Sequence, residues 1–413
     1  MKLLLTHKFF KLTGGAEVFF FETGRLLEEH GHEVVYFSTS TSDNRPSPYE
    51  KYFIDPPEYS DGNILRRAFN IKRMIYSLKA KEKFARLLDD TKPDLVHAFA
   101  IHVHLTPSIL VAAYEADVPV VMSCNDYKHI CPNYKLYHHG HICTDCRGKR
   151  FYKAIVNRCC KDSLAFSIAS SLEAYSHNAM NIYSKYVDMY LFSSEFMARE
   201  TENFWGVGSF CWDMLRNPFE SRKYPYSPDY EDYGLYFGRL IDEKGVDILV
   251  SAAALAPTVR LKIVGNGPDA GKLKALANSL GLNNIEFVGS LWGTALDDIL
   301  KRTRFVVVPS VWHENFPYVI NQSFAFGKAV IGTDRGGIPE LVKHGERGIV
   351  YPAHDIRLLA DAMLDLWNNS EKAVEMGRRA KEYSDSEFND EQQYEKLMSI
   401  YKKVLDARTS SGR

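Results

Sequence analysis

The sequence lacks any run of the roughly 20 apolar residues that a membrane-spanning helix requires, and it has no low-complexity tract or repeat of solenoid period. It also lacks a charge excess of either sign, since 51 lysines and arginines face 52 aspartates and glutamates. A protein without a basic surplus has no general means of replacing counterions on a nucleic acid. The apolar stretch within Met1–Leu12 is short and is interrupted by Thr6, His7 and Lys8, unlike a signal peptide. We therefore expect a cytoplasmic protein that neither binds nucleic acid nor spans a membrane.

Cysteine is scarce and unevenly placed. There are seven cysteines, an odd number, and five of them fall between Cys131 and Cys160, which argues against the disulfide framework of a secreted protein. A structural zinc ion would explain how the polar, histidine-rich segment among them stays ordered. Unligated thiols, a disulfide and an iron–sulfur cluster remain alternatives. The four cysteines whose spacing suits tetrahedral zinc ligation are Cys131, Cys143, Cys146 and Cys159.

The length of the chain indicates two domains. With 413 residues, 45% of them hydrophobic and 25% charged, the chain is globular in composition and too long for one core. Strand-like runs alternate with helical patterns, which predicts α/β domains with parallel sheets. We place a first domain at residues 1–218, a Pro- and Tyr-rich linker at 219–233 and a second domain at 234–384. The last segment is residues 385–413, in which Glu387 to Leu405 form one long amphipathic helical pattern.

The first domain opens with a strand, a glycine turn and a helix. The strand Lys2–Leu5 precedes the turn Gly14-Gly15, and a helix then runs to about His30 before the next strand. This order of elements builds a parallel sheet. A later strand, residues 118–123, ends just before Asn125 and Asp126.

Residues 64–88 form a basic amphipathic stretch. Eight lysines and arginines stand against one acid, Glu82, and apolar residues recur at helical spacing. Such a helix can lie on an anionic membrane surface. A helix packed on the sheet with a solvated basic face has the same pattern. We expect the packed helix here, with peripheral contact with the inner membrane surface as the alternative.

Cations and glycines follow the first two strands of the second domain. Arg239 and Lys244 lie in the loop after the strand that begins at Gly234, and Gly265-Asn266-Gly267 follows the strand of residues 259–264. A Gly-x-Gly turn between a strand and a helix, with an acid about 20 residues on, is typical of dinucleotide binding. This turn supports a rival function, an NAD(P)-dependent enzyme.

The segment from Val307 to Glu340 carries the strongest pattern in the chain. A short strand, a loop with Glu314, a helix with Gln322, a second strand and the turn Gly336-Gly337 succeed one another. In a parallel sheet, the loops after strands gather at the strand carboxyl ends, where ligands bind. Glycine amides at such turns and at helix N-termini bind anions.

This segment resembles that of the retaining glycosyltransferases of family 4, which have the GT-B fold. Their hallmark is Glu-x7-Glu, and Glu314 to Gln322 has that spacing in a similar context. The resemblance extends over most of the chain, and the cysteine run belongs to a subset of the family with the same Asp-Tyr-Lys…Cys-Pro-Asn residues. It implies an α/β protein of two Rossmann-like parallel-sheet domains facing each other across a cleft, with a C-terminal helix crossing back to the first.

The resemblance also implies a role for each matching residue. Glu314 would face the donor sugar, Arg239 and Lys244 would grip the donor diphosphate, and the residue at 322 would hold the ribose. The donor-binding set is then Gly14, Gly15, Arg239, Lys244, Gly265, Asn266, Gly267, Asn315, Phe316, Pro317 and Gln322. The catalytic set is Glu314, Asp126 and Asn125.

Two positions depart from the family pattern. Gln322 stands where the family has a second glutamate, and an amide hydrogen-bonds a ribose hydroxyl more weakly than a carboxylate does. Asn125 stands where the family has a histidine that contacts the donor sugar, and it cannot act as a base near neutral pH. The adjacent Asp126 is then the better candidate for contacting the acceptor hydroxyl or the sugar.

The resemblance therefore implies a glycosyltransferase that moves a sugar from a nucleoside diphosphate donor to a hydroxyl of a lipid-linked or polysaccharide precursor, with retained configuration. Side chains and amides would hold the diphosphate, so no metal is expected in catalysis. Two other functions stay open. One is the NAD(P)-dependent enzyme, and the other is a non-catalytic nucleotide-sugar-binding partner of another transferase.

Overall fold

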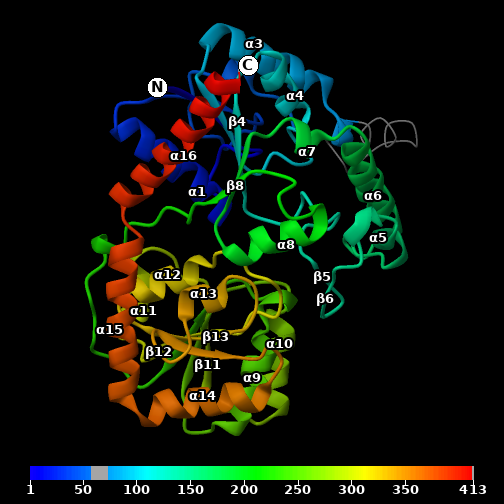
Figure 1. The fold of residues 1–413 in the computed structure, drawn as a ribbon. Helices are drawn as coiled ribbons and strands as arrows, with labels where there is room; N and C mark the ends of the chain where they lie inside the picture. Colours follow the sequence, from blue (N-terminus) through cyan, green and yellow to red (C-terminus); the bar gives the residue numbers. More distant parts are fainter. Residues whose placement is uncertain (57–72, 412–413) are drawn as a thin grey trace. The chain divides into compact units, whose positions relative to one another are not determined.

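The computed structural model describes residues 1–56 and 73–411. The chain divides into two compact units, each with its own parallel sheet (Figure 1). The first unit comprises residues 1–136, 143–218 and 391–413, and the second comprises residues 137–142 and 219–390. Residues 219–233, expected to be a linker, thus belong to the second unit, as does a short segment from within the cysteine-rich region.

The first unit is built on a six-stranded sheet in the order β2-β1-β3-β4-β7-β8, and every pair of neighbours is parallel. Its inner strands are buried on both faces, which is why they read as continuous apolar runs. The strands are β1 (Lys2–Thr6), β2 (Glu33–Phe37), β3 (Leu95–Ala98), β4 (Val120–Cys124), β7 (Met189–Phe192) and β8 (Trp212–Met214). The helices are α1 (Gly15–Glu29), α3 (Leu78–Thr91), α4 (Ser108–Glu115), α5 (Lys153–Val156), α6 (Leu164–Ala179), α7 (Ile182–Lys185), α8 (Glu195–Trp205) and α16 (Asp390–Ser411).

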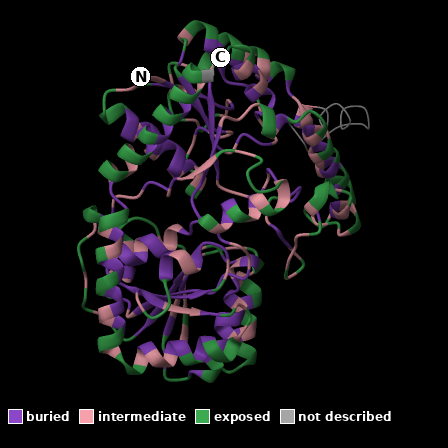
Figure 2. Ribbon diagram, in the orientation of Figure 1, coloured by how far each residue is buried: buried purple, intermediate pink, exposed green. Residues whose placement is uncertain are grey.

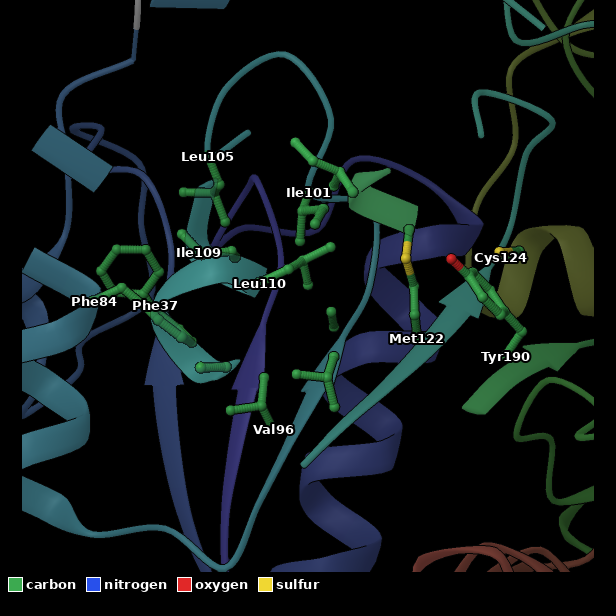
Figure 3. Close-up of a cluster of buried hydrophobic side chains, with 14 of the residues drawn as sticks. Phe37, Phe84, Val96, Ile101, Leu105, Ile109, Leu110, Met122, Cys124 and Tyr190 are labelled. Carbon is green, nitrogen blue, oxygen red and sulfur yellow. The ribbon is translucent and has the colours of Figure 1, made fainter. Parts of the chain in front are cut away.

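One core of this unit lies between the sheet and the helices α3 and α4. Figure 3 shows Phe84 of α3 and Ile109 of α4 beside Phe37 and Val96 of the strands. Phe37 and Phe84 meet edge to face, with ring centroids 4.9 Å apart. The apolar face of α3 is therefore buried against the sheet.

The position of α3 bears on the basic stretch 64–88, of which residues 64–72 lie outside the described residues. In the described part, Phe84, Leu87 and Leu88 are buried in the core. Lys79 and Lys81 form ion pairs with Asp55 and Glu115. This part of the stretch is a helix packed on the sheet, as expected above, and it presents no broad apolar face to a membrane.

The last helix, α16, completes the other core of the first unit. Leu397, Ile400 and Tyr401 are buried together with Leu3 and Leu5 of β1. The Tyr401 hydroxyl also contacts Nδ1 of a buried histidine, His97 of β3, at 2.6 Å. The amphipathic pattern expected from Glu387 to Leu405 thus lies almost wholly in α16, whose apolar side packs on the first unit.

The second unit has a parallel six-stranded sheet in the order β11-β10-β9-β12-β13-β14. Its strands are β9 (Gly234–Phe237), β10 (Leu261–Val264), β11 (Ile285–Gly289), β12 (Phe305–Val308), β13 (Ala329–Thr333) and β14 (Gly348–Tyr351). Its helices are α9 (Val246–Leu255), α10 (Ala270–Ser279), α11 (Thr294–Arg302), α12 (Tyr318–Ala325), α13 (Ile338–Val342), α14 (Ile356–Asn368) and α15 (Ser370–Glu387).

A two-stranded hairpin from the cysteine-rich region is part of the second unit. It consists of β5 (Tyr137–His138) and β6 (His141–Ile142), which pair antiparallel. Tyr137 is buried in the core of this unit with Tyr236 and Leu240. Searched over residues 1–56 and 73–411, the helices include none long and apolar enough to cross a membrane.

Candidate active site

Three loops of the second unit meet at the carboxyl ends of adjacent strands. The 3₁₀ turn Asp242–Lys244 follows β9, the loop with Glu314 follows β12, and the turn Gly336-Gly337 follows β13. Ligands of parallel α/β sheets bind at this edge. The sequence placed its principal candidates here, and the structure brings Lys244, Glu314 and the diglycine turn together.

Glu314 is the central acid of this group. It is 6% exposed, and its Oε1 accepts hydrogen bonds from Lys244 Nζ at 2.5 Å and from Ser310 Oγ at 2.7 Å. Burial acts to raise the pKa of Glu314, but the Lys244 ammonium and these hydrogen bonds outweigh it and hold the pKa below the ordinary value. The carboxylate therefore stays ionised in a site with little water.

The diglycine turn holds the Glu314 backbone. Gly337 N–H donates to the Glu314 carbonyl at 2.7 Å. Gly336 has φ +58°, and a Cβ there would lie 2.0 Å from the same carbonyl oxygen. Only glycine fits this combination of conformation and contact. Thr333, at the end of β13, donates to the Ser310 carbonyl at 2.7 Å, so β13 also positions the start of the loop.

Lys244 is positioned by the contacts of its own turn. Val311 N–H donates to the Glu243 carbonyl at 3.0 Å, which joins the turn to the Glu314 loop. On the other side, the hydroxyl of Tyr137 donates to Asp242 Oδ2 at 3.1 Å. The hairpin thus braces the turn that carries Lys244.

The remaining predicted donor residues near β9 and β10 divide into two kinds. Arg239 is exposed at the start of the loop after β9. Gly265 and Gly267 are pressed against that same loop, since a Cβ on them would lie 1.9 Å from the Gly238 carbonyl oxygen and 2.2 Å from that of Leu240. The protein's own backbone therefore requires these two glycines. The side chain of Asn266 is exposed beside them and accepts from Gly267 N–H at 2.8 Å.

The predicted donor-binding residues around α12 also differ in how far they are buried. Pro317 precedes the helix, and Gln322 lies within it, half-buried. Asn315 is half-buried in the loop. The side chain of Phe316 packs in the core, 5.6 Å from Phe388 between ring centroids. Only its backbone is left for a ligand.

In the first unit, polar groups gather at the carboxyl edge of its sheet. Burial raises the pKa of Asp126, against the effect of the Lys8 ammonium and the Lys128 N–H. Burial, together with Lys8, lowers the pKa of His104 to about 4. Both amide atoms of Asn125 are buried, and neither has a hydrogen-bond partner among the residues that the structure describes. Because an unpaired buried amide is costly, Asn125 is suited to receive a polar ligand.

The glycine turn of the first unit begins α1. Gly14 precedes the helix with an extended backbone, Gly15 is its first residue, and both are exposed. Exposed amides at the start of a 15-residue helix can bind an anion. The neighbouring acid Glu17 is buried, and its Oε1 lies 3.7 Å from Nε2 of His7.

The first unit also contains a cavity of about 160 Å³. A buried ion pair lines it, in which Lys128 Nζ lies 2.7 Å from Glu173 Oε2. Tyr183 and Trp205 supply aromatic walls. Sequence reasoning did not find this pair, because Lys128 and Glu173 carry no pattern that distinguishes them from surface charges.

The cysteines of the 131–160 region gather in the first unit, and no disulfide joins any of them. Burial, then the Cys131 and Cys143 thiols, raises the pKa of Cys146 to about 12. The Cys159 thiol donates to Cys160, which lowers the pKa of Cys160 to about 6. Within the described residues, however, no group of three or more His, Cys, Asp or Glu side chains is arranged to hold a metal ion. The thiols interact without forming a ready tetrahedral site, and zinc binding stays a prediction.

Sequence reasoning missed two residues that shape the active-site loops. Ser310 bonds Glu314 directly, and its place immediately after the β12 strand and Pro309 was the available signal. Tyr137 bonds Asp242 across 105 positions of sequence, and no local pattern could reveal this contact.

Two family models match the chain. Residues 219–383 match Glycosyl transferases group 1, and residues 13–210 match Glycosyltransferase Family 4. An uncharacterized glycosyltransferase of Methanocaldococcus jannaschii is 30% identical over 42% of this chain and 49% of its own length. O-antigen chain mannosyltransferase C of Escherichia coli is 25% identical over 43% of this chain and 48% of its own. The chain thus spans about half the length of these curated relatives.

Solved structures share the fold over nearly the whole chain. Sucrose-phosphate synthase from Thermosynechococcus elongatus has a TM-score of 0.70 at 16% identity, covering 98% of this chain and 99% of that one. Anabaena HepE in complex with UDP has a TM-score of 0.64 at 16% identity, covering 98% and 100%. Together with the two family models, these matches show that the chain belongs to the glycosyltransferases of group 1 and family 4 and has their GT-B fold of two parallel-sheet α/β domains.

Proposed function

We propose that the protein transfers a sugar from a nucleoside diphosphate donor to a hydroxyl acceptor, with retention of the anomeric configuration. The observation that carries this proposal is Glu314, a buried carboxylate kept ionised by Lys244 and Ser310 at the carboxyl edge of the sheet. Family membership supports the reaction class, and the donor class agrees with the UDP bound to Anabaena HepE.

In this proposal the donor diphosphate binds the loop after β9. Arg239 supplies a planar guanidinium for two phosphate oxygens, and Lys244 supplies a point charge. Lys244 is then shared between Glu314 and a phosphate oxygen. Gln322 binds the ribose through its amide, and Asn266 and the backbone of residues 315–317 complete the donor contacts.

The chemistry requires no base on the protein. The acceptor oxygen attacks the anomeric carbon from the face that the diphosphate leaves, and the bond between that carbon and the diphosphate oxygen breaks. The acceptor proton passes to the departing phosphate oxygen, so atoms and charges balance. Cations near the diphosphate stabilise its developing charge, and Glu314 faces the electron-poor sugar. Asn125 can therefore replace a histidine without blocking the reaction.

The acceptor in this proposal is a hydroxyl of a lipid-linked or polysaccharide precursor. Support comes from the relative described as an O-antigen chain mannosyltransferase. In the first unit, Asp126 and the unpaired amide of Asn125 are the polar groups suited to bind hydroxyls. The absence of a disulfide among the seven cysteines, all within the described residues, favours a reducing compartment such as the cytoplasm.

A non-catalytic nucleotide-sugar-binding subunit is the second candidate, favoured by the two departures Asn125 and Gln322. The NAD(P)-dependent rival has lost its main support. Close backbone contacts account for Gly265 and Gly267 without any dinucleotide.

A thermal-shift screen with uridine, guanosine and adenosine diphosphates and their sugars tests the donor site, and release of nucleoside diphosphate tests turnover. We expect the diphosphate of one nucleoside to raise the melting temperature. The corresponding nucleotide sugar should be consumed. Arg239→Ala should abolish both effects, while Lys272→Ala, on an exposed lysine of α10, should change neither. Binding without turnover with any donor and acceptor would favour the non-catalytic subunit. A failure of every nucleotide to bind would overturn the proposal.

A further inference from the structure

Helix α6 has the reverse of the usual arrangement of a surface helix, because it buries polar side chains and exposes large apolar ones. Apart from Ala169, its buried side chains are polar and are Ser167, Ser171, Glu173 and His177. Its exposed side chains include the large hydrophobic residues Leu164, Ile168, Leu172 and Tyr175. Figure 2 shows exposed residues in green along the helix that is labelled α6 in Figure 1. These four follow the spacing i, i+4, i+8 and i+11, so they lie in one stripe along the helix. Soluble helices normally place such a stripe against the core.

Polar contacts hold the helix in this orientation. Glu173 pairs with the buried Lys128, and Ser171 Oγ donates to the Phe151 carbonyl at 2.9 Å. Cys160 N–H donates to Ser167 Oγ at 3.2 Å, and His177 Nε2 donates to the Ile75 carbonyl at 2.7 Å. Rotating α6 to bury its stripe would break all four contacts. The apolar stripe is therefore fixed on the outside.

The apolar surface continues onto the segment before α6. Tyr152 and Val156 of the α5 region are 48% and 68% exposed. The Tyr152 N–H donates to the Tyr175 hydroxyl at 3.2 Å, which joins this segment to the stripe. Eight of the nineteen exposed large hydrophobic side chains in the described part of the chain lie between Tyr152 and Met180. We call the surface formed by Tyr152, Val156, Leu164, Ile168, Leu172 and Tyr175 the α5–α6 face.

The segment that forms this face also carries several lysines and arginines. Between residues 149 and 180 there are five lysines and arginines and two acids. One of those acids, Glu173, points inward to Lys128 and does not offset the outer charge. Lys161 lies over the Phe166 ring at 4.6 Å, at the start of α6. The five cations are Lys149, Arg150, Lys153, Arg158 and Lys161.

An apolar stripe with aromatic residues and adjacent cations fits an anionic lipid surface. The hydrocarbon boundary takes up the apolar side chains, and the headgroups attract the lysines and arginines. A second copy of this chain fits less well, because two such faces would bring their cations together. We infer that the α5–α6 face binds the surface of an anionic membrane. This contact is independent of the donor site in the second unit.

Vesicle sedimentation of the full chain tests this inference. Vesicles of phosphatidylcholine alone are compared with vesicles in which roughly one third of the lipid is phosphatidylglycerol. We expect binding to the anionic vesicles that weakens at high salt. Leu172→Glu should reduce that binding roughly tenfold or more, because it places a negative charge, which the anionic headgroups repel, in the apolar surface. Arg158→Glu with Lys161→Glu should reduce it by a similar factor.

The matched control is Leu280→Glu. Leu280 is 44% exposed in the second unit, close to the 49% of Leu172. Leu280→Glu should bind vesicles like the wild type. The melting temperature and the shift produced by a bound nucleoside diphosphate show whether each variant is folded. Sedimentation without any nucleotide separates this inference from the proposed transfer reaction.

Three results would overturn the inference. The first is no binding to anionic vesicles. The second is a folded Leu172→Glu protein that binds as well as the wild type. The third is a dimer in solution that Leu172→Glu converts to monomer, since a second copy would then cover the face.

Discussion

Lys244 and Glu314 are 70 positions apart in sequence, yet Nζ of one lies 2.5 Å from Oε1 of the other. Both side chains are largely withdrawn from water, with 19% and 8% exposed. A buried carboxylate without a partner would take up a proton more readily. The ion pair therefore keeps Glu314 charged, and it links the loop after β9 to the loop after β12.

Replacing Lys244 with methionine should leave Glu314 as a buried charge without its partner. Removing one member of such a pair costs roughly 3–5 kcal/mol of unfolding free energy. The pKa of Glu314 should rise at the same time, and nucleotide binding should be lost. Urea unfolding at neutral pH measures the loss, with Lys272→Met on the surface of α10 as the control. Equal stability of the two variants would contradict a stabilising role for the pair.

Gly336→Ala should destabilise the protein more than the same change at Gly345. Both glycines have positive φ, and that conformation costs alanine roughly 1–2 kcal/mol. Gly345 has open space around its Cβ position, whereas a Cβ on Gly336 would collide with the Glu314 carbonyl. Only Gly336→Ala should also abolish the nucleotide-induced shift in melting temperature. If both variants bind nucleotide normally, the diglycine turn does not position Glu314.

His97 should make the protein less stable in acid. Burial lowers its pKa from 6.5 to about 3 in the folded protein, so only the unfolded chain binds its proton between these values. The stability linked to His97 is complete above about pH 6.5 and falls by roughly 1.4 kcal/mol per pH unit toward pH 3.

The test compares urea unfolding of the wild type and His97→Gln between pH 7 and pH 4. Other buried histidines, such as His7, give slopes of the same sign, so the difference between the two proteins isolates His97. The variant should be less stable at pH 7, because Tyr401 and Ser123 lose their partner. It should also lose stability more slowly in acid. Parallel pH profiles would show that His97 is not buried in its neutral form.

Metal analysis of the purified protein tests the zinc site at Cys131, Cys143, Cys146 and Cys159. We expect about one zinc per chain, since four thiolates complete a structural site. Cys143→Ser should lower the zinc content and the melting temperature, whereas Cys211→Ser, on an exposed cysteine outside the cluster, should change neither. Less than about 0.2 zinc per chain in the wild type would discard the site and leave the cluster as unligated thiols.

The sequence was most informative where local pattern and function coincide. The strand before Glu314 and the glycines that follow it could be placed from their residues, because strand, loop and helix periods are local properties. The same reasoning located Lys244 in the loop after β9. It could not show that Lys244 touches Glu314, because that contact depends on the order of strands in the sheet.

The basic stretch and α6 show a second limit of the sequence. Both have mixed apolar and polar residues, and periodicity alone does not say which side of a helix faces the core. In α3 the apolar residues such as Phe84 are buried, as the period suggests. In α6 the buried carboxylate of Glu173 accepts a hydrogen bond from Lys128, which comes 45 positions earlier. The contact with Lys128 decides which side of α6 faces the core, and the hydrophobic period of the helix does not reveal this contact.

The placement of α16 has a consequence for how the protein is made. Leu3 and Leu5 share a core with Leu397 and Tyr401, which follow the whole of the second unit in the chain. The second unit can close its own sheet while the first unit still has an uncovered apolar surface. The first unit should therefore complete its folding only after α16 has been made, later than the second unit can fold.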